Sequence, residues 1–302
     1  MKVLVTGAAG MLGTDVCKVM ASRGHLVTAS ARANGEGEIR PGFLPLDITD
    51  TAACREQIRA LCPDAILHCA AWTNVDGAER DLEGAYRGNA LGAWNVASAA
   101  AAVGAIMVYV STDFVFDGEK GTPYTEFDRV NPLGAYGASK EAGEQLVRQT
   151  LPHRHIIART SWLFGIHGKN FVTTIQRLAQ KLPEVPVVSD QVGCPTFTPD
   201  LAGKLADLLE APLLPGTYHI SNAGHCSWFA FAQAIVKKSE LKTPVVPITG
   251  AEYAEKFNSP TRRPAFSPLR PLALEMRGMN DLRPWEDALD RYLVTLADNP
   301  SR

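Results

Sequence analysis

A tyrosine and a lysine stand four residues apart at the start of a segment with a helical pattern, YGASKEAGEQLVRQT (136–150). Residues four apart share one face of a helix, so Tyr136 and Lys140 are expected to lie about one turn apart. A phenol with its ordinary pKa near 10 is a poor acid–base catalyst at neutral pH, and a neighbouring ammonium lowers that pKa toward the working range. The pair therefore predicts proton transfer, although this spacing alone occurs by chance in many proteins.

A second polar group stands where an apolar run stops. In YVSTDFVFDG (109–118), Ser111, Thr112 and Asp113 follow a run that reads as a buried strand from residue 105. Hydroxyl and acidic residues at such a point are ordinary turn formers. Here, however, Tyr136 comes 24 residues after Thr112, so the polar group is also a candidate for the functional end of a strand.

Three glycines follow the first apolar run, in TGAAGMLG (6–13), with the spacing G-x-x-G-x-x-G at Gly7, Gly10 and Gly13. Glycines between a strand and a helix permit a tight turn and close approach of the backbone to a pyrophosphate, which the helix N-terminus then binds. The pattern predicts dinucleotide binding, with Met11 and Leu12 in the same segment. The alternative is a turn that serves packing alone.

The residues after the second predicted strand favour one dinucleotide. NAD sites usually carry an acid about 20 residues after the glycines, whereas this chain has Ser30 and Arg32 in TASAR. A hydroxyl and a guanidinium suit a ribose 2′-phosphate, so NADPH is expected, with NADH as the alternative cofactor. The alternative is that Arg32 is only a solvated loop charge, in which case the choice between NADPH and NADH stays open.

Two further segments are expected to contact the cofactor at the carboxyl edge of the sheet. Asp47 and Ile48 in LDITD come just past a strand, where Asp47 would contact an adenine amine or cap the next helix, readings that the sequence leaves even. The small residues of CAAWTNVD (69–76) would let a cofactor lie across the carboxyl edge of the sheet. The residues predicted there are Ala70, Ala71 and Thr73.

The elements that must position these side chains alternate in the first half of the chain. Apolar runs predict strands at 2–6, 25–30, 42–46, 65–70, 105–111 and 155–159, and helical patterns lie before Ser22 and at 51–61, 83–102 and 136–150. Buried strands separated by helices predict the α/β class, with a Rossmann-type doubly wound parallel sheet. Further helices are expected at 169–182, 199–210, 227–239 and 285–297.

The regular alternation of strands and helices ends after Thr160, where Pro-rich stretches such as 260–271 separate the helices. We therefore expect residues 1–160 to form an NADP(H)-binding domain, to which later segments return. Residues 161–302 are expected to form mainly a smaller, irregular substrate-binding region laid against the sheet.

Composition excludes several classes of partner. The 302-residue chain is 46% hydrophobic and 21% charged with a formal net charge of −2, so no basic field predicts binding to nucleic acid or an anionic membrane. No apolar run approaches the length that spans a bilayer, and the apolar start is too short for a signal peptide. A cytoplasmic location is expected, as a monomer or homodimer.

Several blocks together resemble a known superfamily. TGAAGMLG, CAAWTNVDGAE, STDFVFDG and YGASK, in this order, are similar to the extended short-chain dehydrogenase/reductases. Later blocks narrow the resemblance to the dTDP-4-dehydrorhamnose reductase family: RTSWLFG (159–165), KNFVTT (169–174), DQVGCPT (190–196), YHISNAGHCSW (218–228) and RRPAFSPL (262–269). The resemblance covers nearly the whole chain.

The resemblance implies NADPH-dependent reduction of the C4 ketone of a nucleotide sugar. Tyr136 would protonate the carbonyl oxygen, Lys140 would lower the pKa of Tyr136 and hold the nicotinamide ribose, and Thr112 would donate a hydrogen bond to the same oxygen. The residues that would contact the substrate are Val75, Asp113, Phe114, Trp162 and Arg263, with Arg262 beside the last. Trp162 as a core aromatic, and the two arginines as solvated charges, are the alternatives.

The chain also departs from its relatives. Phe114 stands where they often carry a tyrosine, and only Asp15 lies where some place a magnesium-binding glutamate, so no metal is expected. Asn89 matches a structural asparagine of the superfamily, although on its helix it could equally face water.

Three rival functions remain. A 4,6-dehydratase needs an acid at position 114, which Phe114 argues against, and an epimerase is disfavoured by the C-terminal blocks. A non-catalytic NADP-binding subunit, like the regulatory subunit of methionine adenosyltransferase, would not need Thr112, Tyr136 and Lys140 together.

Overall fold

Seven parallel strands form the central sheet, in the order β11-β6-β5-β4-β1-β2-β3. The computed structural model describes residues 1–33 and 42–298. Apolar runs buried on both faces make the inner strands. The strands are β1 (Lys2–Thr6), β2 (Leu26–Ala31), β3 (Leu44–Pro45), β4 (Ala65–His68), β5 (Ile106–Thr112), β6 (His155–Thr160) and β11 (Gly216–His219).

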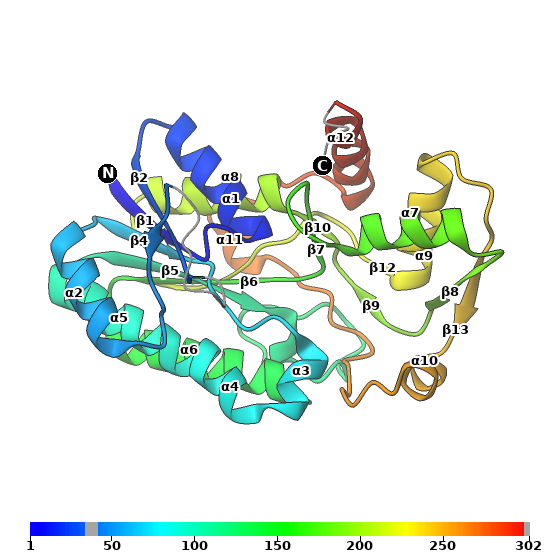
Figure 1. Cartoon of the computed structure of the whole chain (residues 1–302), viewed down its shortest axis with the longest axis horizontal. Coiled ribbons are helices and arrows are strands. Elements are labelled where there is room, and N and C mark those ends of the chain that lie inside the picture. Colours follow the sequence, from blue (N-terminus) through cyan, green and yellow to red (C-terminus); the bar gives the residue numbers. More distant parts are fainter. Residues whose placement is uncertain (34–41, 299–302) are drawn as a thin grey trace.

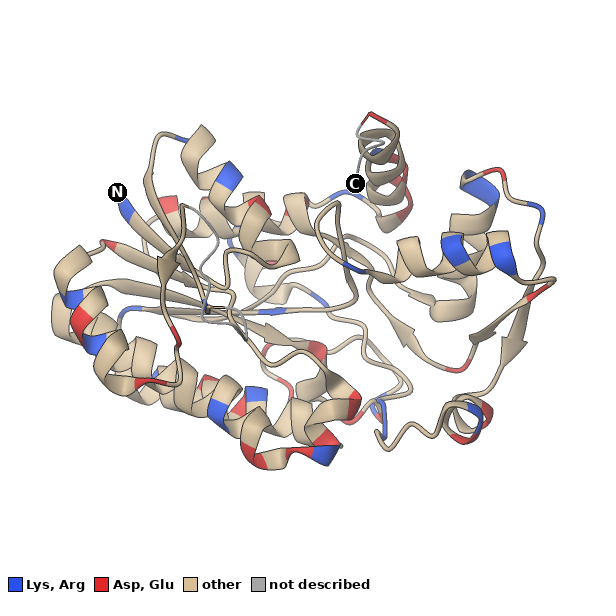
Figure 2. Cartoon of the chain, in the orientation of Figure 1, with Lys and Arg blue, Asp and Glu red and all other residues tan. Residues whose placement is uncertain are grey.

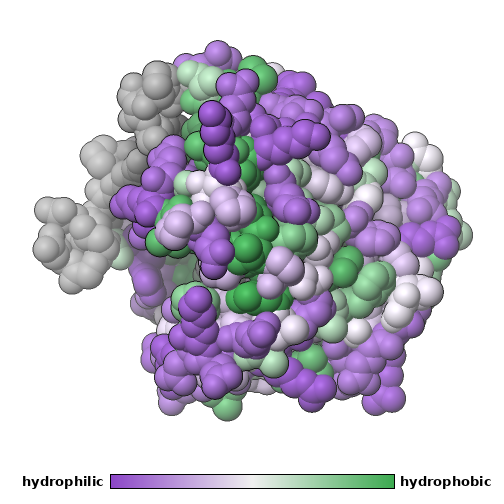
Figure 3. All heavy atoms as spheres, turned by 90° about the vertical axis from the view of Figure 1, so that its right-hand side faces the viewer, coloured by the Kyte–Doolittle hydropathy of each residue, from purple (hydrophilic) through white to green (hydrophobic). Residues whose placement is uncertain are grey.

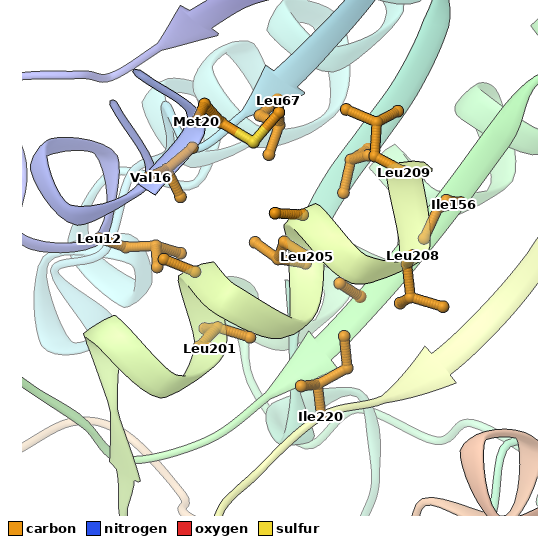
Figure 4. Packing of buried hydrophobic residues seen from close by; sticks show 14 of the residues in the cluster. Leu12, Val16, Met20, Leu67, Ile156, Leu201, Leu205, Leu208, Leu209 and Ile220 are labelled. Carbon is orange, nitrogen blue, oxygen red and sulfur yellow. The ribbon is translucent and has the colours of Figure 1, made fainter. Parts of the chain in front are cut away.

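Helices cover both faces of this sheet, which lies between them in the left half of Figure 1. On one face lie α1 (Met11–Ser22), α8 (Thr198–Glu210) and α11 (Leu272–Met276), and on the other α2 (Thr51–Leu61), α5 (Gly92–Val103) and α6 (Ala135–Thr150). Figure 4 shows the hydrophobic core on the face of the sheet that α1 and α8 cover, where leucines of α8 and apolar residues of α1 pack on the strands. Its labelled members include Leu12, Val16, Leu67, Ile156, Leu201 and Leu205.

A smaller region forms the right half of Figure 1. It contains α7 (Phe171–Lys181), α9 (Trp228–Lys238), α10 (Gly250–Phe257) and the pair β8 (Val185–Val188) and β13 (Val245–Ile248). It also contains two further strand pairs and a helix: β7 (Leu163–Phe164) with β10 (Thr196–Phe197), β9 (Val192–Gly193) with β12 (Cys226–Ser227), and α12 (Trp285–Ala297). Its aromatic-rich core centres on Phe164, Phe197, Phe231 and Tyr292.

The outer surface is mixed in charge and mostly hydrophilic. Figure 2 shows lysine and arginine interspersed with aspartate and glutamate along the outer helices. The end face in Figure 3 is largely hydrophilic, with a narrow run of hydrophobic residues near its centre. Within residues 1–33 and 42–298, none of the helices is long and apolar enough to cross a membrane.

Most predicted elements lie where expected, but one predicted helix is broken and several short elements, with β11 among them, were not predicted. The helix predicted at 83–102 is built from α4 (Leu82–Tyr86), a π-helical turn η1 (Arg87–Leu91) and α5, preceded by α3 (Val75–Arg80). The strand β11 has no counterpart in the prediction; it pairs with β6, with Gly216 beside Ile156 and His219 beside Arg159. The chain thus returns to the sheet through α8 and β11 after residue 160.

Candidate active site

The polar group after residue 110 lies at the carboxyl end of β5. The strand ends at Thr112, whose hydroxyl accepts a hydrogen bond from Phe114 N (3.2 Å) and so caps the short 3-10 helix η2 (Asp113–Val115). The same hydroxyl donates to Oδ1 of Asp113 (3.2 Å), and Ser267 donates to Oδ2 (2.6 Å). These side chains therefore cap a turn and also form a fixed polar group at the end of the strand.

Asp113 is almost completely buried, with 1% of its surface exposed. Burial raises the pKa of Asp113 to about 6, against the hydrogen bonds from Ser267 and Thr112, which lower it. A carboxyl with this pKa changes its protonation state close to neutral pH, which is a feature of functional sites.

Tyr136 lies in the first turn of α6, beside the same strand end. Its ring meets the Phe114 ring edge-on, with centroids 5.6 Å apart. Burial raises the pKa of Tyr136 to about 12 and Asp113 adds to the rise, whereas a hydrogen bond with Thr112 opposes it. The Thr112 hydroxyl is thus close enough to the Tyr136 phenol to influence its pKa, so the two groups could act on one oxygen.

The expected lowering of the Tyr136 pKa by Lys140 is wrong for this structure, in which the pKa is raised. The Lys140 ammonium donates instead to Val110 O (2.7 Å) and lies 4.0 Å from the centroid of the Tyr109 ring. Burial lowers the pKa of Lys140 itself to about 7, although Glu144 opposes the shift. Desolvation, which the sequence does not reveal, outweighs the pairwise attraction assumed from spacing.

Glu144 is a site residue that the sequence reading missed. It is fully buried on the face of α6 that carries Lys140, one turn further on. Its carboxylate accepts from Ser111 Oγ (2.6 Å) and twice from Arg159, at 2.9 and 2.7 Å. Burial alone would raise the pKa of Glu144, but the charges and hydrogen bonds of Arg159 and Arg148 hold it below its ordinary value. The spacing of 136, 140 and 144 was the available signal.

Asn89 is buried inside the π turn η1 and does not face water, so the structural reading is confirmed. Its amide accepts from Trp72 N (2.8 Å) and donates to Trp72 O (3.1 Å) and to Ser139 Oγ (2.9 Å). The Asn89 carbonyl accepts from Tyr109 OH at 3.1 Å. Asn89 thus joins the segment after β4 to the helix that carries Tyr136 and Lys140.

The glycine loop has the shape that a pyrophosphate requires. Gly7 adopts φ +66°, and a Cβ there would lie 2.6 Å from Ala70 N. A Cβ on Gly13 would lie 2.7 Å from Ala8 Cα, so this glycine permits close packing of α1 on the loop. Gly10 is the N-cap of α1 without a side-chain hydrogen bond, which leaves the helix N-terminus open to an anion. Met11 and Leu12 begin α1, and Leu12 is buried.

Of the residues predicted to contact the adenosine, some line a pocket and others are buried in the interior. Arg32 and Asp47 line one open pocket, together with Ala33, Pro45, Leu46, Ala53 and Gln57. The Ser30 hydroxyl is buried within the sheet and donates to Val5 O (3.2 Å), away from the pocket lining. Ile48 is also buried, against Gly92 of α5.

Asp47 does not cap the following helix. Asp50 is the N-cap of α2 and accepts from Ala53 N at 3.0 Å. Asp47 Oδ1 accepts instead from the amide (2.9 Å) and hydroxyl (2.8 Å) of Thr49. Of the two readings of Asp47, the adenine contact is the one still open. Ala70 and Ala71 are half-buried beside Gly7, and Thr73 is exposed.

Besides Asp113 and Phe114 of η2, the predicted substrate residues lie on three other segments. Val75 opens α3, and Trp162 follows β6, where it is half-buried. Arg263 pairs with Asp76 (3.1 Å), to which Ser259 and Thr261 also donate, at 2.8 and 2.7 Å.

Arg262 and Asp15 have other partners. Arg262 is exposed, 3.7 Å from Glu119. Asp15 accepts from Thr198 Oγ1 (2.6 Å). Across the described parts of the chain, no group of three or more His, Cys, Asp or Glu side chains is placed to hold a metal ion.

Comparison with known proteins gives consistent results. A family model described as the RmlD substrate binding domain matches residues 1–297. The spore coat polysaccharide biosynthesis protein SpsK of Bacillus subtilis is 41% identical, covering 97% of this chain and 96% of that protein. The dTDP-4-dehydrorhamnose reductase of Streptomyces griseus is 38% identical, with 99% and 95% covered.

A solved structure agrees with the fold over the same length. The dTDP-4-dehydrorhamnose reductase of Bacillus anthracis, crystallised in complex with NADP, has a TM-score of 0.88 and 38% sequence identity. The match covers 97% of this chain and 99% of that one. The Rossmann-type sheet and the smaller region are therefore shared with a protein whose structure contains the dinucleotide.

Proposed function

The chain belongs to the family described as the RmlD substrate binding domain, and from that premise we propose that it reduces the C4 ketone of dTDP-4-dehydro-L-rhamnose with NADPH, giving dTDP-L-rhamnose. The observation that carries the proposal is the meeting of Thr112 and Tyr136 at the carboxyl end of β5, in a chain that aligns along nearly its full length with reductases of this name. A regulatory subunit without catalysis would not require this pair.

The residues present fit NADPH. The glycine loop has no room for side chains at Gly7 and Gly13, and the helix N-terminus beyond Gly10 is free to receive a pyrophosphate. Arg32, in the pocket at the end of β2, would bind the ribose 2′-phosphate, and Asp47 would receive the adenine amine. When bound there, the cofactor supplies the hydride.

Tyr136 and Thr112 would act on the substrate oxygen. A pKa of about 12 keeps the Tyr136 hydroxyl protonated at neutral pH, so it can give its proton to the carbonyl oxygen as that oxygen becomes an alkoxide. Thr112 would turn its hydroxyl proton from Asp113 toward the same oxygen, where it stabilises the developing charge.

Lys140 would hold the nicotinamide ribose, the role that the resemblance implies. Its ammonium is buried one turn after Tyr136 on α6 and donates to Val110 O at 2.7 Å. The predicted lowering of the resting Tyr136 pKa is not carried into the proposed mechanism.

We assign the two regions as follows. Residues 1–160, with α8 and β11 returning to the sheet, would bind NADP(H), and the rest of 161–302 would bind the nucleotide sugar. Sugar contacts would come from Val75, Asp113, Phe114, Trp162 and Arg263, which lie on the segments that border the carboxyl edge.

The test is oxidation of NADPH by the purified chain with dTDP-4-dehydrorhamnose, followed by NMR of the product. Turnover that yields the L-rhamno configuration at C4 is expected. Tight NADP binding without turnover would instead favour the non-catalytic reading, and turnover with a different C4 configuration would mark a reductase of another sugar. Mixing of C4 epimers without net consumption of NADPH would indicate an epimerase.

A further inference from the structure

We propose that Ser267 is a positioning residue for the reduction: its hydroxyl holds the Asp113 carboxylate in the orientation that presents Oδ1 to the Thr112 hydroxyl. Ser267 would touch neither the substrate nor the cofactor, and would act through Asp113 and Thr112. The proposal rests on the proposed function, because it concerns the polar group at the end of β5 that is assigned to the substrate oxygen.

Two hydroxyls share the two oxygens of this carboxylate. Ser267 Oγ donates to Asp113 Oδ2 at 2.6 Å, a length typical of a hydrogen bond between a hydroxyl and a charged carboxylate. Thr112 Oγ1 donates to Oδ1 at the longer distance of 3.2 Å. Ser267 and Asp113 are 2% and 1% exposed, so bulk water does not compete for the shorter bond. The contact with Ser267 therefore fixes the carboxylate, and Thr112 binds the oxygen that remains.

The backbone around Ser267 is itself held on two sides. Val192 N donates to Ala265 O (2.8 Å), and Ser267 N donates to Val192 O (2.9 Å). Tyr124 N donates to Pro268 O at 2.8 Å. Because Ser267 precedes a proline, its backbone is also restricted to extended conformations. The Ser267 hydroxyl is thus in place without any contribution from the substrate.

This arrangement lets Thr112 change partners while Asp113 stays still. In the proposed reaction Thr112 turns its proton from Asp113 Oδ1 toward the substrate oxygen, so the carboxylate loses one donor. A buried carboxylate with too few donors is costly. The bond from Ser267 to Oδ2 persists during the change, so Asp113 keeps its orientation and Thr112 returns to the same acceptor.

Hydrogen bonds also govern the charge of Asp113. Burial raises the pKa of Asp113 to about 6, and among its hydrogen bonds the one from Ser267 opposes this rise most. Tyr136 on α6 and Cys194 after β9 are close enough to interact with its charge. Burial raises the pKa of Tyr136 to about 12 and that of Cys194 to about 11, so both are neutral where Asp113 titrates. Removing the Ser267 hydroxyl should therefore raise the pKa of Asp113 further.

The experiment compares Ser267→Ala, Asp113→Asn and the double variant with wild type. Ser161→Ala is the matched control, since Ser161 is 3% exposed and donates to a backbone carbonyl, Cys194 O, at 2.7 Å. The titration of Asp113 is followed by carboxyl-carbon NMR of protein labelled at its aspartates, and Asp113→Asn identifies the signal. Steady-state kinetics give kcat and the two KM values.

Ser267→Ala should raise the midpoint of the Asp113 titration by about one to two pH units, and Ser161→Ala should leave it unchanged. We expect Ser267→Ala to lower kcat about tenfold with KM for NADPH unchanged. In the Asp113→Asn background the same change should lower kcat by no more than about twofold, because the partner through which Ser267 acts is gone. If Ser267→Ala does not fold, Ser267→Cys, a weaker donor, should give a smaller shift in the same direction.

An unchanged Asp113 titration in the folded Ser267 variant, or an equal loss of kcat with and without the Asp113 carboxylate, would overturn the proposal. The NMR titration does not require turnover. If wild type fails to reduce the nucleotide sugar while the Asp113 titration still depends on Ser267, the proposed function fails and the hold of Ser267 on the carboxylate remains.

Discussion

At the scale of single residues, the proposed reaction requires a Tyr136 hydroxyl that stays protonated. Replacing Tyr136 with phenylalanine removes that proton and leaves the ring contact with Phe114 in place. We expect kcat to fall about 10²–10⁴-fold, the usual contribution of a general acid, with the Kd of NADPH nearly unchanged. Single-turnover assays and cofactor titration measure the two quantities, and retained activity would remove Tyr136 from its role.

Arg32 is the residue that we propose selects the cofactor. Arg32→Ser removes the guanidinium from the pocket at the end of β2 and leaves the glycine loop unchanged. KM for NADPH should rise about tenfold or more through loss of a charge-assisted phosphate contact, while KM for NADH stays constant. Equal effects on both cofactors would show that Arg32 does not contact the 2′-phosphate.

The buried carboxyl of Asp113 makes stability depend on pH. Because burial raises its pKa from 3.8 to about 6, the folded state binds the proton more tightly than the unfolded state, and stability is lost as pH rises from about 4 to 6. Asp113→Asn removes this loss, so relative to wild type it should gain about 3 kcal/mol across that window. Urea unfolding at several pH values measures the difference.

Asp117 provides a control of opposite sign. Hydrogen bonds from Asn131 and from the backbone of Glu119 lower its pKa, so its contribution is present above its unfolded pKa and lost as pH falls. Asp117→Asn should therefore become less stable relative to wild type as pH rises. If both variants changed in the same direction, the assignment of the raised pKa to Asp113 would be wrong.

At the scale of elements, helix α6 carries the proposed catalytic residues Tyr136 and Lys140, and neighbouring elements set its position. Asn89→Ala removes the hydrogen bonds to Trp72 and Ser139 and leaves buried polar groups unpaired, which should cost about 2–4 kcal/mol in unfolding free energy. Because Ser139 lies on α6 between Tyr136 and Lys140, kcat should fall as well. Calorimetry and steady-state kinetics test the two effects.

Asn95 offers a matched control on the same helical segment. It is also buried, but it binds Ile48 O (2.9 Å) and the Thr51 hydroxyl (3.0 Å), away from α6. Asn95→Ala should lose comparable stability and keep its kcat at saturating NADPH. A similar loss of kcat in both variants would mean that lower stability alone explains the effect of Asn89.

The elements themselves were largely predictable, because apolar runs and helical periods are local signals. Residues 51–61 and 285–297 are helical as expected, and strand ends such as Thr112 lie within a residue or so of prediction. The π turn at Arg87–Leu91 was not predictable, since it depends on partners distant in sequence: Asn89 reaches Trp72 and Ser139. The strand Gly216–His219 was missed because GTYH has no apolar run.

The sequence predicted which residues lie near one another in the candidate site better than it predicted their pKa values and hydrogen bonds. Tyr136 and Lys140 lie one turn apart on α6 and Thr112 ends β5, yet the pKa of Tyr136 shifts upward and Lys140 donates to Val110 O. Both results depend on desolvation, which only the packed structure determines. Ser30 shows the same limit, since its sequence position could not reveal that its hydroxyl is inside the sheet.

At the scale of the whole molecule, the loop at residues 259–263 is bound to helix α3 through one carboxylate. Asp76 of α3 receives donors from Ser259, Thr261 and Arg263. A substrate diphosphate would compete with Asp76 for the guanidinium of Arg263, which is paired but 26% exposed.

Arg263→Ala should therefore raise KM for the nucleotide sugar about tenfold, as expected for one lost arginine–phosphate contact. Its neighbour Arg262, with 73% of its side chain exposed, serves as the control, and Arg262→Ala should change KM by no more than about twofold. Kinetics at two salt concentrations measure both. Indistinguishable variants would place the diphosphate elsewhere.

The late position of β11 in the chain has a consequence for biosynthesis. During translation β6 leaves the ribosome well before β11, so the sheet acquires β6 first as an unpaired edge strand. Ser267, which holds the carboxylate beside Thr112, emerges later still. The glycine loop is therefore complete early in synthesis, whereas the polar group around Asp113 is complete only when nearly the whole chain has been made. A chain that stalls after β6 and before β11 exposes the edge of β6, on which aggregation can begin.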